Sequence, residues 1–251
     1  MQFAFLSDQG MVRKLNEDSG GVYPHPLGYY LAVVADGMGG HRAGDVASAM
    51  AVRLLEEYWR EIPPLKRPTE AEEWLSSSIE SINEKLYSHA ANHEECEGMG
   101  TTIVAAICTK EFITLGNVGD SRGYIWNNER IRQITEDHSF VNALVQSGEI
   151  SREDAEHHPN KNLLLKALGS EGKIKPDVRT IEFEQGDLVL LCSDGLSNKI
   201  TEAFIEEIMI NFQSLDERAK QLIEKANSEG GEDNITIAMV EFSPVVESEG
   251  I

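Results

Sequence analysis

The feature that most constrains this chain is an apolar run that ends abruptly in a carboxylate, within YLAVVADGMGGHRAGDVA at positions 30–47. The run from Tyr30 to Ala35 is short, rich in valine and free of polar breaks, which is typical of a buried strand. Asp36 follows directly, and three glycines in the next four residues let other groups approach the backbone closely. Positions 45–58 then predict a helix. We therefore expect a rigid strand end that aims Asp36 into a cleft.

The same pattern recurs at three further places in the chain. Asp120 follows the apolar run at 114–118, Asp194 follows the run at 188–192, and Asp233 precedes a strand predicted at 235–240. Each aspartate alone also fits an incidental turn residue. Four carboxylates gathered at strand ends would repel one another unless cations lay between them, and hard divalent ions prefer oxygen ligands. The pattern predicts a site for Mg²⁺ or Mn²⁺ rather than Zn²⁺.

A dense charged segment follows the first predicted strand, at positions 2–6. It contains Arg13, Glu17 and Asp18 within a polar stretch from Ser7 to Ser19. Arginine offers a planar fork that suits a phosphate group. A solvated loop with a surface arginine is the simpler interpretation of this segment taken alone.

Length, charge and cysteine content exclude several classes. The 251 residues suffice for one large domain with a full core, and the formal net charge of −21 argues against binding nucleic acid or an anionic membrane surface. Three cysteines, an odd number, are typical of reduced core thiols in a cytoplasmic protein. The first ten residues lack the features of a signal peptide, and no apolar run is long enough to span a bilayer.

Successive hairpins predict antiparallel sheets. Apolar runs at 103–108 and 112–118, and again at 123–126 and 131–134, are separated by short turns, which disfavours a doubly wound parallel fold. Long helices are predicted at 69–91, 201–210 and 215–226. Three short helices, at 140–146, 151–157 and 163–168, form a polar region that lies over a site as a flap or is a packing insertion.

The end of the helix at 69–91 offers a competing metal site. His89 and His93 are four residues apart, so one helix face can present both, and Cys96 lies nearby. No fourth ligand is evident in the sequence. A solvated helix end is therefore the favoured interpretation.

Seven segments occur in a fixed order: SDQGMVRKLNED, VADGMGGHRAGDVAS, GMGTT, NVGDSR, EDHS, LCSDGLSN and GEDNIT. Together they span positions 7–236 and resemble the motif series of the metal-dependent protein phosphatases (PPM), the 2C-type serine/threonine phosphatases. The DGMGGH form is similar to the bacterial branch. The resemblance implies an α+β fold, a four-layer αββα sandwich with two antiparallel β-sheets packed face to face and flanked by helices. It also implies one catalytic domain at 1–242, with a flap subdomain at about 143–169, and leaves a polar acidic tail at 243–251.

The resemblance also implies roles for individual residues. Asp36 bridges two core metal ions, and Arg13 binds the phosphate group. Asp120 joins Asp194 around a third, weaker ion. The implied core ligands are Asp18, Asp36, the Gly37 carbonyl, Asp194 and Asp233, with Glu17 and Asn234 acting through water or from behind the ligands.

The implied reaction is hydrolysis of phosphoserine and phosphothreonine in proteins by a metal-bridging water, without a covalent intermediate. Animal enzymes of the family place a histidine directly after the Asp-Gly pair, where this chain has Met38. His41 either protonates the leaving group or holds its loop, and a metal-bound water is the alternative acid. The implied partners are phosphorylated proteins and a cognate bacterial serine/threonine kinase, and a monomer is expected.

Two other classes of function fit parts of the same pattern. A regulatory module on the same fold would be expected to lose metal carboxylates, and all those expected are present. A metal-dependent hydrolase of small phosphoesters differs from a protein phosphatase only in substrate, so an assay has to separate them. The sequence does not decide between Mg²⁺ and Mn²⁺, because both suit oxygen ligands.

Overall fold

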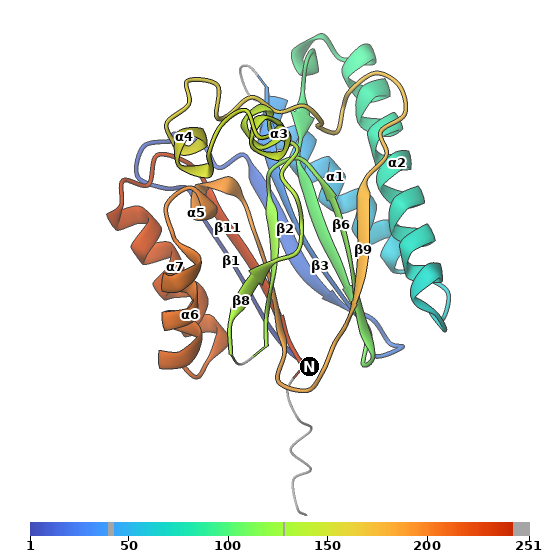
Figure 1. Ribbon diagram of the computed structural model, residues 1–251. Coiled ribbons are helices and arrows are strands. Elements are labelled where there is room, and N and C mark those ends of the chain that lie inside the picture. Colours follow the sequence, from blue (N-terminus) through green and yellow to red (C-terminus); the bar gives the residue numbers. More distant parts are fainter. Residues whose placement is uncertain (40–42, 128, 243–251) are drawn as a thin grey trace, which may run out of the picture.

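The computed structural model describes residues 1–39, 43–127 and 129–242 (Figure 1). Two antiparallel β-sheets pack face to face, and helices cover both outer sides. The predicted tail at 243–251 and the candidate acid His41 lie outside the described residues. Within them, no helix combines the length and the apolar character needed to cross a membrane.

The first sheet brings the two ends of the described chain together. Strand β1 pairs with β11 along its whole length, and β11 in turn pairs with β10. The strand order is β1 (Gln2–Asp8), β11 (Ile235–Glu241), β10 (Leu188–Cys192), β7 (Arg122–Trp126) and β8 (Ile131–Gln133).

The second sheet contains the strand that leads to Asp36. Its order is β2 (Asp18–Pro24), β3 (Tyr30–Met38), β5 (Ile103–Cys108), β6 (Phe112–Val118) and β9 (Asp177–Glu182), and the short β4 (Gly100–Thr101) also pairs with β3. The two predicted hairpins are confirmed as β5–β6 and β7–β8. Strand β2 was not predicted, because Gly20 and Gly21 interrupt its apolar pattern.

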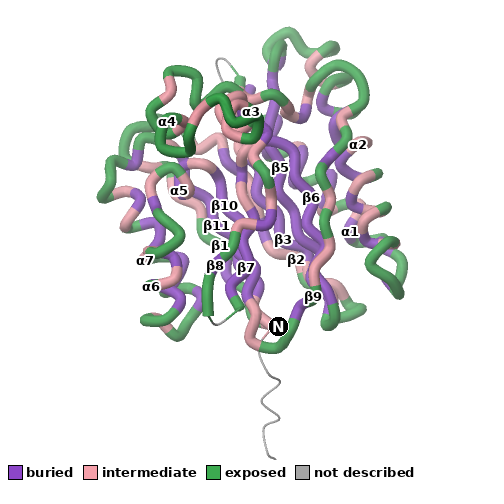
Figure 2. Tube along the Cα trace, viewed as in Figure 1, coloured by how far each residue is buried: buried purple, intermediate pink, exposed green. Residues whose placement is uncertain are grey.

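Two helical layers cover the sheets (Figure 1). Helices α1 (Ala43–Trp59) and α2 (Pro68–Asn92) pack on the second sheet, whereas α6 (Glu202–Asn211) and α7 (Leu215–Ser228) pack on the first. Small residues on the buried face of α1, at Ala43, Ala47 and Ala51, let that helix lie close to β3. A third apolar cluster fills the space between the sheets, where the chain is almost continuously buried (Figure 2).

Alternation along β3 explains the unbroken apolar run at its start. Leu31 and Val33 contact the helical layer, whereas Ala32 and Val34 face the other sheet, and none of the four is exposed. Side chains alternate between the faces of a strand, so both faces must be apolar when both are covered. By the same alternation, Asp36 continues the face of Ala32 and Val34 at the edge of the intersheet space.

The region at 143–169 lies at one end of the sandwich, together with α5 (Asp194–Ser197) (Figure 1). It includes most of α3 (Phe140–Ser147) and all of α4 (Arg152–Glu156), two of the three predicted short helices. The third prediction, a helix at 163–168, is wrong. The segment is extended and forms bridges from Leu164 to Ser139 and from Leu168 to Thr101. The Leu165 and Leu168 amides donate to distant segments, at His138 and Thr101, so the local leucine pattern does not decide the structure.

Candidate metal centre

Asp36 is held by its backbone at the end of β3. Its amide donates to the Thr102 hydroxyl at 2.9 Å, and its carbonyl accepts from the Thr101 hydroxyl and the Thr102 amide, both at 2.9 Å. These contacts give the GMGTT motif a physical role, because they fix the main chain of Asp36 at the edge of the intersheet space.

Gly37 is required by the close approach of two other segments. A Cβ at this position would lie 2.1 Å from the Gly44 carbonyl oxygen and 2.6 Å from that of Glu17. Any side chain would therefore push α1 and the loop before β2 away from β3. The glycine keeps Glu17 beside the strand end that carries Asp36.

Asp18 lies directly opposite Asp36 in the pairing of β2 with β3. Its side chain is buried, and its Oδ2 accepts from the Ser193 hydroxyl at 2.7 Å. Ser193 immediately precedes Asp194, so this bond connects the second sheet to the first across the end of the sandwich. Sequence reasoning did not find Ser193, because a serine before a strand-end aspartate carries no distinctive signal.

Asp194 and Asp120, which are partly buried, complete the group. Asp194 is the first residue of α5, its Oδ2 accepts from Asn198 at 3.0 Å, and its carboxyl group lies within hydrogen-bonding reach of Asp36. Asp120 follows β6 and Gly119, and its charge acts on both Asp36 and Asp194. The structure therefore brings four predicted ligands together: Asp18, Asp36, Asp120 and Asp194.

Burial and mutual repulsion make this group poorly suited to carrying four negative charges alone. Burial, and then the charges of neighbouring aspartates, raise the pKa of Asp18 and of Asp120 to about 7 against opposing hydrogen bonds. The pKa of Asp36 is raised well above its usual range by burial and then by the charges of Asp18 and Asp194. A divalent cation among these groups would favour the ionised forms.

Unpartnered oxygens show that the donors fit a metal ion. Among the described residues, Asp18 Oδ1 and Asp194 Oδ1 are buried and have no hydrogen-bond partner. Buried carboxylate oxygens are normally paired, and oxygen is the donor that hard divalent ions prefer. Within the described residues, no group of three His, Cys, Asp or Glu side chains is already arranged around one point as a metal site.

Arg13, Asp233 and Asn234 form the rim of the site. Arg13 donates from Nη2 to Asp233 Oδ2 at 2.7 Å and lies 3.8 Å from Glu17 Oε2. Asn234 accepts from the Glu17 amide at 2.8 Å and donates to the Gln9 and Leu15 carbonyls at 2.9 and 3.0 Å. Asn234 thus shapes the loop that carries Arg13 and Glu17. Asp233 pairs with Arg13, and its charge also acts on Asp18, Asp36 and Asp194.

The competing site on α2 does not assemble a ligand set. The rings of His89 and His93 are stacked with centroids 4.0 Å apart, and both residues lie at the exposed end of the helix. Cys96 is buried in the core that packs against α1. This arrangement agrees with the solvated helix end favoured from the sequence.

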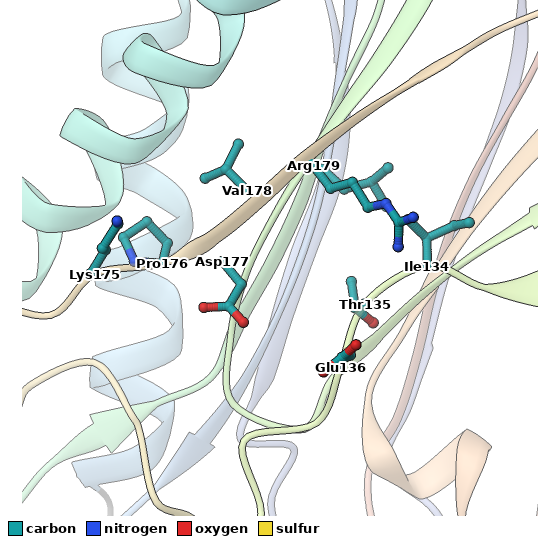
Figure 3. A pocket seen from close by; sticks show the side chains of 9 residues that line it. Ile134, Thr135, Glu136, Lys175, Pro176, Asp177, Val178 and Arg179 are labelled. Atoms are coloured by element: carbon teal, nitrogen blue, oxygen red, sulfur yellow. The ribbon is translucent and has the colours of Figure 1, made fainter. Parts of the chain in front are cut away.

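A hollow of about 390 Å³ opens at a different place, between β9 and the segment after β8 (Figure 3). Its lining mixes acidic Glu136 and Asp177 with basic Lys175 and Arg179. None of the four buried aspartates lines it. Asp177, which lines the hollow, contacts His138 at the edge of the loop that carries Asp120.

Comparisons with known proteins agree with this architecture. A family model described as "Protein phosphatase 2C" matches residues 12–227. The chain is 50% identical over 241 residues to "Serine/threonine phosphatase stp" of Listeria innocua, covering 96% of each chain. A structure of the S. agalactiae serine/threonine phosphatase superposes with a TM-score of 0.91 at 37% identity, covering 96% of this chain and 99% of that one. The catalytic domain of the serine threonine protein phosphatase PstP, in complex with two manganese ions, gives 0.83 at 35% identity, with coverages of 95% and 96%. These likenesses confirm the predicted α+β sandwich.

Proposed function

We propose a metal-based mechanism for this chain. The chain belongs to the protein phosphatase 2C family, which is metal-dependent. Relatives that match nearly its whole length are named serine/threonine phosphatases, so the chain is a serine/threonine protein phosphatase of the bacterial type. The prediction from the motif series is confirmed for the family, the fold class and the reaction. The residues that perform the reaction, and the ions that they hold, form the proposal.

The pair of unpartnered oxygens on Asp18 and Asp194 carries this proposal. The second oxygen of each carboxylate is already hydrogen-bonded, so each carboxylate is oriented and half satisfied. Leaving such groups without a partner is destabilising unless an ion compensates. Two unpartnered carboxylate oxygens are unfavourable in a metal-free protein, and they are expected in a site that works with a bound cation.

The proposed core ligands are Asp18, Asp36, the Gly37 carbonyl, Asp194 and Asp233. When bound, two divalent ions acidify a water near neutral pH and offset negative charge on the phosphoryl oxygens. We propose Mn²⁺ or Mg²⁺ for this chain, supported by the oxygen-only donor set and by the two manganese ions of PstP. Asp120 would share a third, weakly held ion with Asp194, and Glu17 would act through water.

Arg13 is proposed to bind the phosphate group of the substrate. Its guanidinium lies at the rim and is paired with Asp233. If Asp233 turns towards a metal ion, the arginine fork becomes available for two phosphoryl oxygens. Proton donation to the leaving alkoxide is assigned to His41 or to a bound water, and His41 lies outside the described residues.

The biological setting is also a proposal. Phosphorylated proteins are the substrates that the relatives' names support, and a cognate bacterial kinase would supply them. We propose one catalytic domain at 1–242 with a flap at 143–169, acting as a monomer. Three buried cysteines that form no disulfide support a cytoplasmic location.

One assay series tests the proposal. Turnover of a phosphothreonine peptide is measured with Mn²⁺, after chelation and after Mn²⁺ is restored, beside a panel of nucleotides and sugar phosphates. We expect activity only with metal, and a higher kcat/KM for phosphopeptides than for the small phosphoesters. Activity that survives complete chelation would remove the metal centre, and preference for small phosphoesters would select the other hydrolase class.

A further inference from the structure

We propose that His138 is a positioning residue that fixes the loop of Asp120 and ties this loop to the flap. The inference rests on the proposed function, because it treats Asp120 as a metal ligand. His138 belongs to the EDHS motif, to which neither the sequence nor the proposed mechanism assigns a role. It is buried, and its contacts extend to two segments distant in sequence.

His138 binds both polar backbone groups of Gly119. The Gly119 amide donates to the ring Nδ1 at 3.0 Å, and the Gly119 carbonyl accepts from the His138 amide at 2.9 Å. Gly119 has φ +110°, and a Cβ there would lie 2.6 Å from the Thr102 side chain. A side chain at position 119 would clash with Thr102, so this position needs glycine. One histidine fixes the residue immediately before Asp120.

The hydrogen bonds also define the tautomer of the ring. Because the Gly119 amide donates to Nδ1, this nitrogen is unprotonated and Nε2 carries the hydrogen. Nε2 lies 3.1 Å from Asp177 Oδ2, whereas Lys166 Nζ donates to the other oxygen of Asp177 at 3.2 Å. The Asp177 carboxylate thus accepts from both donors, which explains why Lys166 and the ring lie only 3.3 Å apart.

The backbone of His138 binds the return segment of the flap, at 163–168. The Leu165 amide donates to the His138 carbonyl at 2.7 Å, and Lys166 reaches Asp177 beside the ring. Further along, Leu168 exchanges two backbone bonds with Thr101, whose hydroxyl donates to the Asp36 carbonyl. The return segment is therefore connected to the supports of both Asp36 and Asp120. A shift of the flap would reach Asp120 through His138.

Asp137 anchors the histidine from the preceding position. Its carboxylate receives hydrogen bonds from Arg122 Nε and Nη2, and from Gln133 at 3.0 Å. Arg122 lies two residues after Asp120. The EDHS motif therefore holds the Asp120 loop at both ends, through Gly119 before the aspartate and Arg122 after it.

Two amide substitutions at His138 separate its contact with Gly119 from its contact with Asp177. His138→Asn places an amide oxygen near the position of Nδ1, so it preserves the acceptor for Gly119 and loses the contact with Asp177. His138→Gln extends towards Asp177 and loses the acceptor for Gly119. His93→Asn, at the exposed end of α2, is the matched control, because it makes the same exchange away from the site.

The first measurement uses metal-free protein and does not depend on activity. ¹⁵N NMR of the imidazole should show Nδ1 unprotonated and Nε2 protonated at neutral pH. Exchange of the Gly119 amide should be slow in the wild type and in His138→Asn, and faster in His138→Gln. The opposite tautomer, or equal exchange in the two variants, would overturn the proposal even if the metal centre were fully confirmed.

The second measurement is calorimetric titration with Mn²⁺ beside kinetics on a phosphopeptide. Outer contacts to ligand loops commonly change metal affinity by about 10–100-fold, so His138→Gln should weaken the weakest Mn²⁺ site roughly tenfold or more and lower kcat. His138→Asn should retain that site and change mainly KM, through the flap. Loss of the tight sites in His138→Gln, or the same pattern in both variants, would contradict positioning through Gly119. Absence of any Mn²⁺ binding in the wild type would instead reject the proposed function.

Discussion

Asp137 and the aspartates around Asp36 lie near one another in the fold, yet their carboxylates are satisfied in opposite ways. Asp137 accepts three hydrogen bonds from Arg122 at 2.7–3.1 Å and another from Gln133, so both of its oxygens are partnered. Asp18 and Asp194 each retain one buried oxygen without a partner in the described chain. The residue type is the same, and only the source of the compensating charge differs.

This difference distinguishes a structural carboxylate from a metal-binding one. Removing a carboxylate from water is costly, and a well-placed arginine recovers much of that free energy. Asp137 has such an arginine in the same chain. Burial, and then the charges of neighbouring aspartates, raise the pKa values of Asp36 and Asp194 and disfavour the ionised state. Their compensating charge must come from solution, so their stability depends on the ions present.

The largest effect is expected for Asp36→Asn. The substitution keeps the shape of the side chain and removes the charge proposed to bridge two cations, so turnover should fall roughly 10³-fold or more. Removing one of several repelling charges should also raise the stability of the metal-free protein. The measurements are phosphopeptide turnover at saturating Mn²⁺ and the free energy of unfolding in chelator.

The turnover and the metal-free stability of Asp36→Asn test different parts of the comparison with Asp137. Near wild-type turnover at saturating Mn²⁺ would remove Asp36 from the metal centre. A metal-free variant less stable than the wild type would mean that the aspartates are not in net repulsion, and the contrast with Asp137 would fail.

A substitution at Asp137, whose carboxylate is fully hydrogen-bonded, should lower stability instead of raising it. Asp137→Asn leaves Arg122 without its counter-charge, and breaking such a partly buried pair should lower the free energy of unfolding by about 2–4 kcal/mol. The loss should already be present without Mn²⁺, because Asp137 is not a proposed ligand, and it should be larger with Mn²⁺, because the Arg122–Asp137 pair also holds the loop of Asp120. Chemical denaturation under both conditions measures it.

An exposed ion pair provides the matched control for Asp137. Glu57→Gln breaks the pair between Arg53 and Glu57, which lies on the surface of α1, and should change stability by less than about 1 kcal/mol. If Asp137→Asn were no more damaging than Glu57→Gln, the Arg122 pair would not be a structural element of this region.

The sequence predicted the layers well because both faces of the central strands are covered. The continuous apolar runs that lead to Asp36 and Asp194 are a direct consequence of burial between a sheet and a helical layer, and both strands are confirmed. Strand β2 and the extended segment at 163–168 were not recognised. Their structures depend on partners distant in sequence, namely β3 and the residues around Thr101 and His138.

The sequence predicted the site only in part. Aspartates at the ends of apolar runs are visible in the amino-acid pattern itself, so Asp36, Asp120 and Asp194 could be selected from the sequence alone. The groups that hold them could not, because Ser193, Thr102 and His138 are ordinary polar residues until the fold brings them into contact. The pairing of Asp233 with Arg13 was also not foreseen, since it joins residues 220 positions apart.

The pH dependence of stability should differ between the metal-free and metal-bound protein. Burial, with further repulsion from neighbouring charges, raises the folded-state pKa of Asp18 and Asp120 to about 7 from an unfolded value of 3.8. In this interval the folded state binds more protons, so metal-free stability should increase as the pH falls from 7 to 5.5, by about 3 kcal/mol for the two groups together. Unfolding by denaturant at several pH values in chelator measures this slope.

Saturating Mn²⁺ should reverse the sign, because the ions replace the protons and are displaced as the carboxylates protonate. Stability of the metal-bound protein should therefore fall over the same pH range. Slopes of the same sign with and without Mn²⁺ would show that the ion does not bind among these aspartates.

The smallest effect is expected at the rim, where Arg13 is about half exposed and its pair with Asp233 is open to solvent. Arg13 differs from Arg122 in this respect, since its partner is a proposed metal ligand and its fork is free to change partners. If Arg13 binds phosphate in the ground state, Arg13→Ala should raise KM roughly tenfold and change kcat less, whereas Arg13→Lys should recover part of the loss. The substrate should be a small aryl phosphate, so that contacts with a peptide do not contribute. An unchanged KM would make Arg13 a surface loop residue, and equal effects on kcat and kcat/KM would mean that its contact forms only in the transition state.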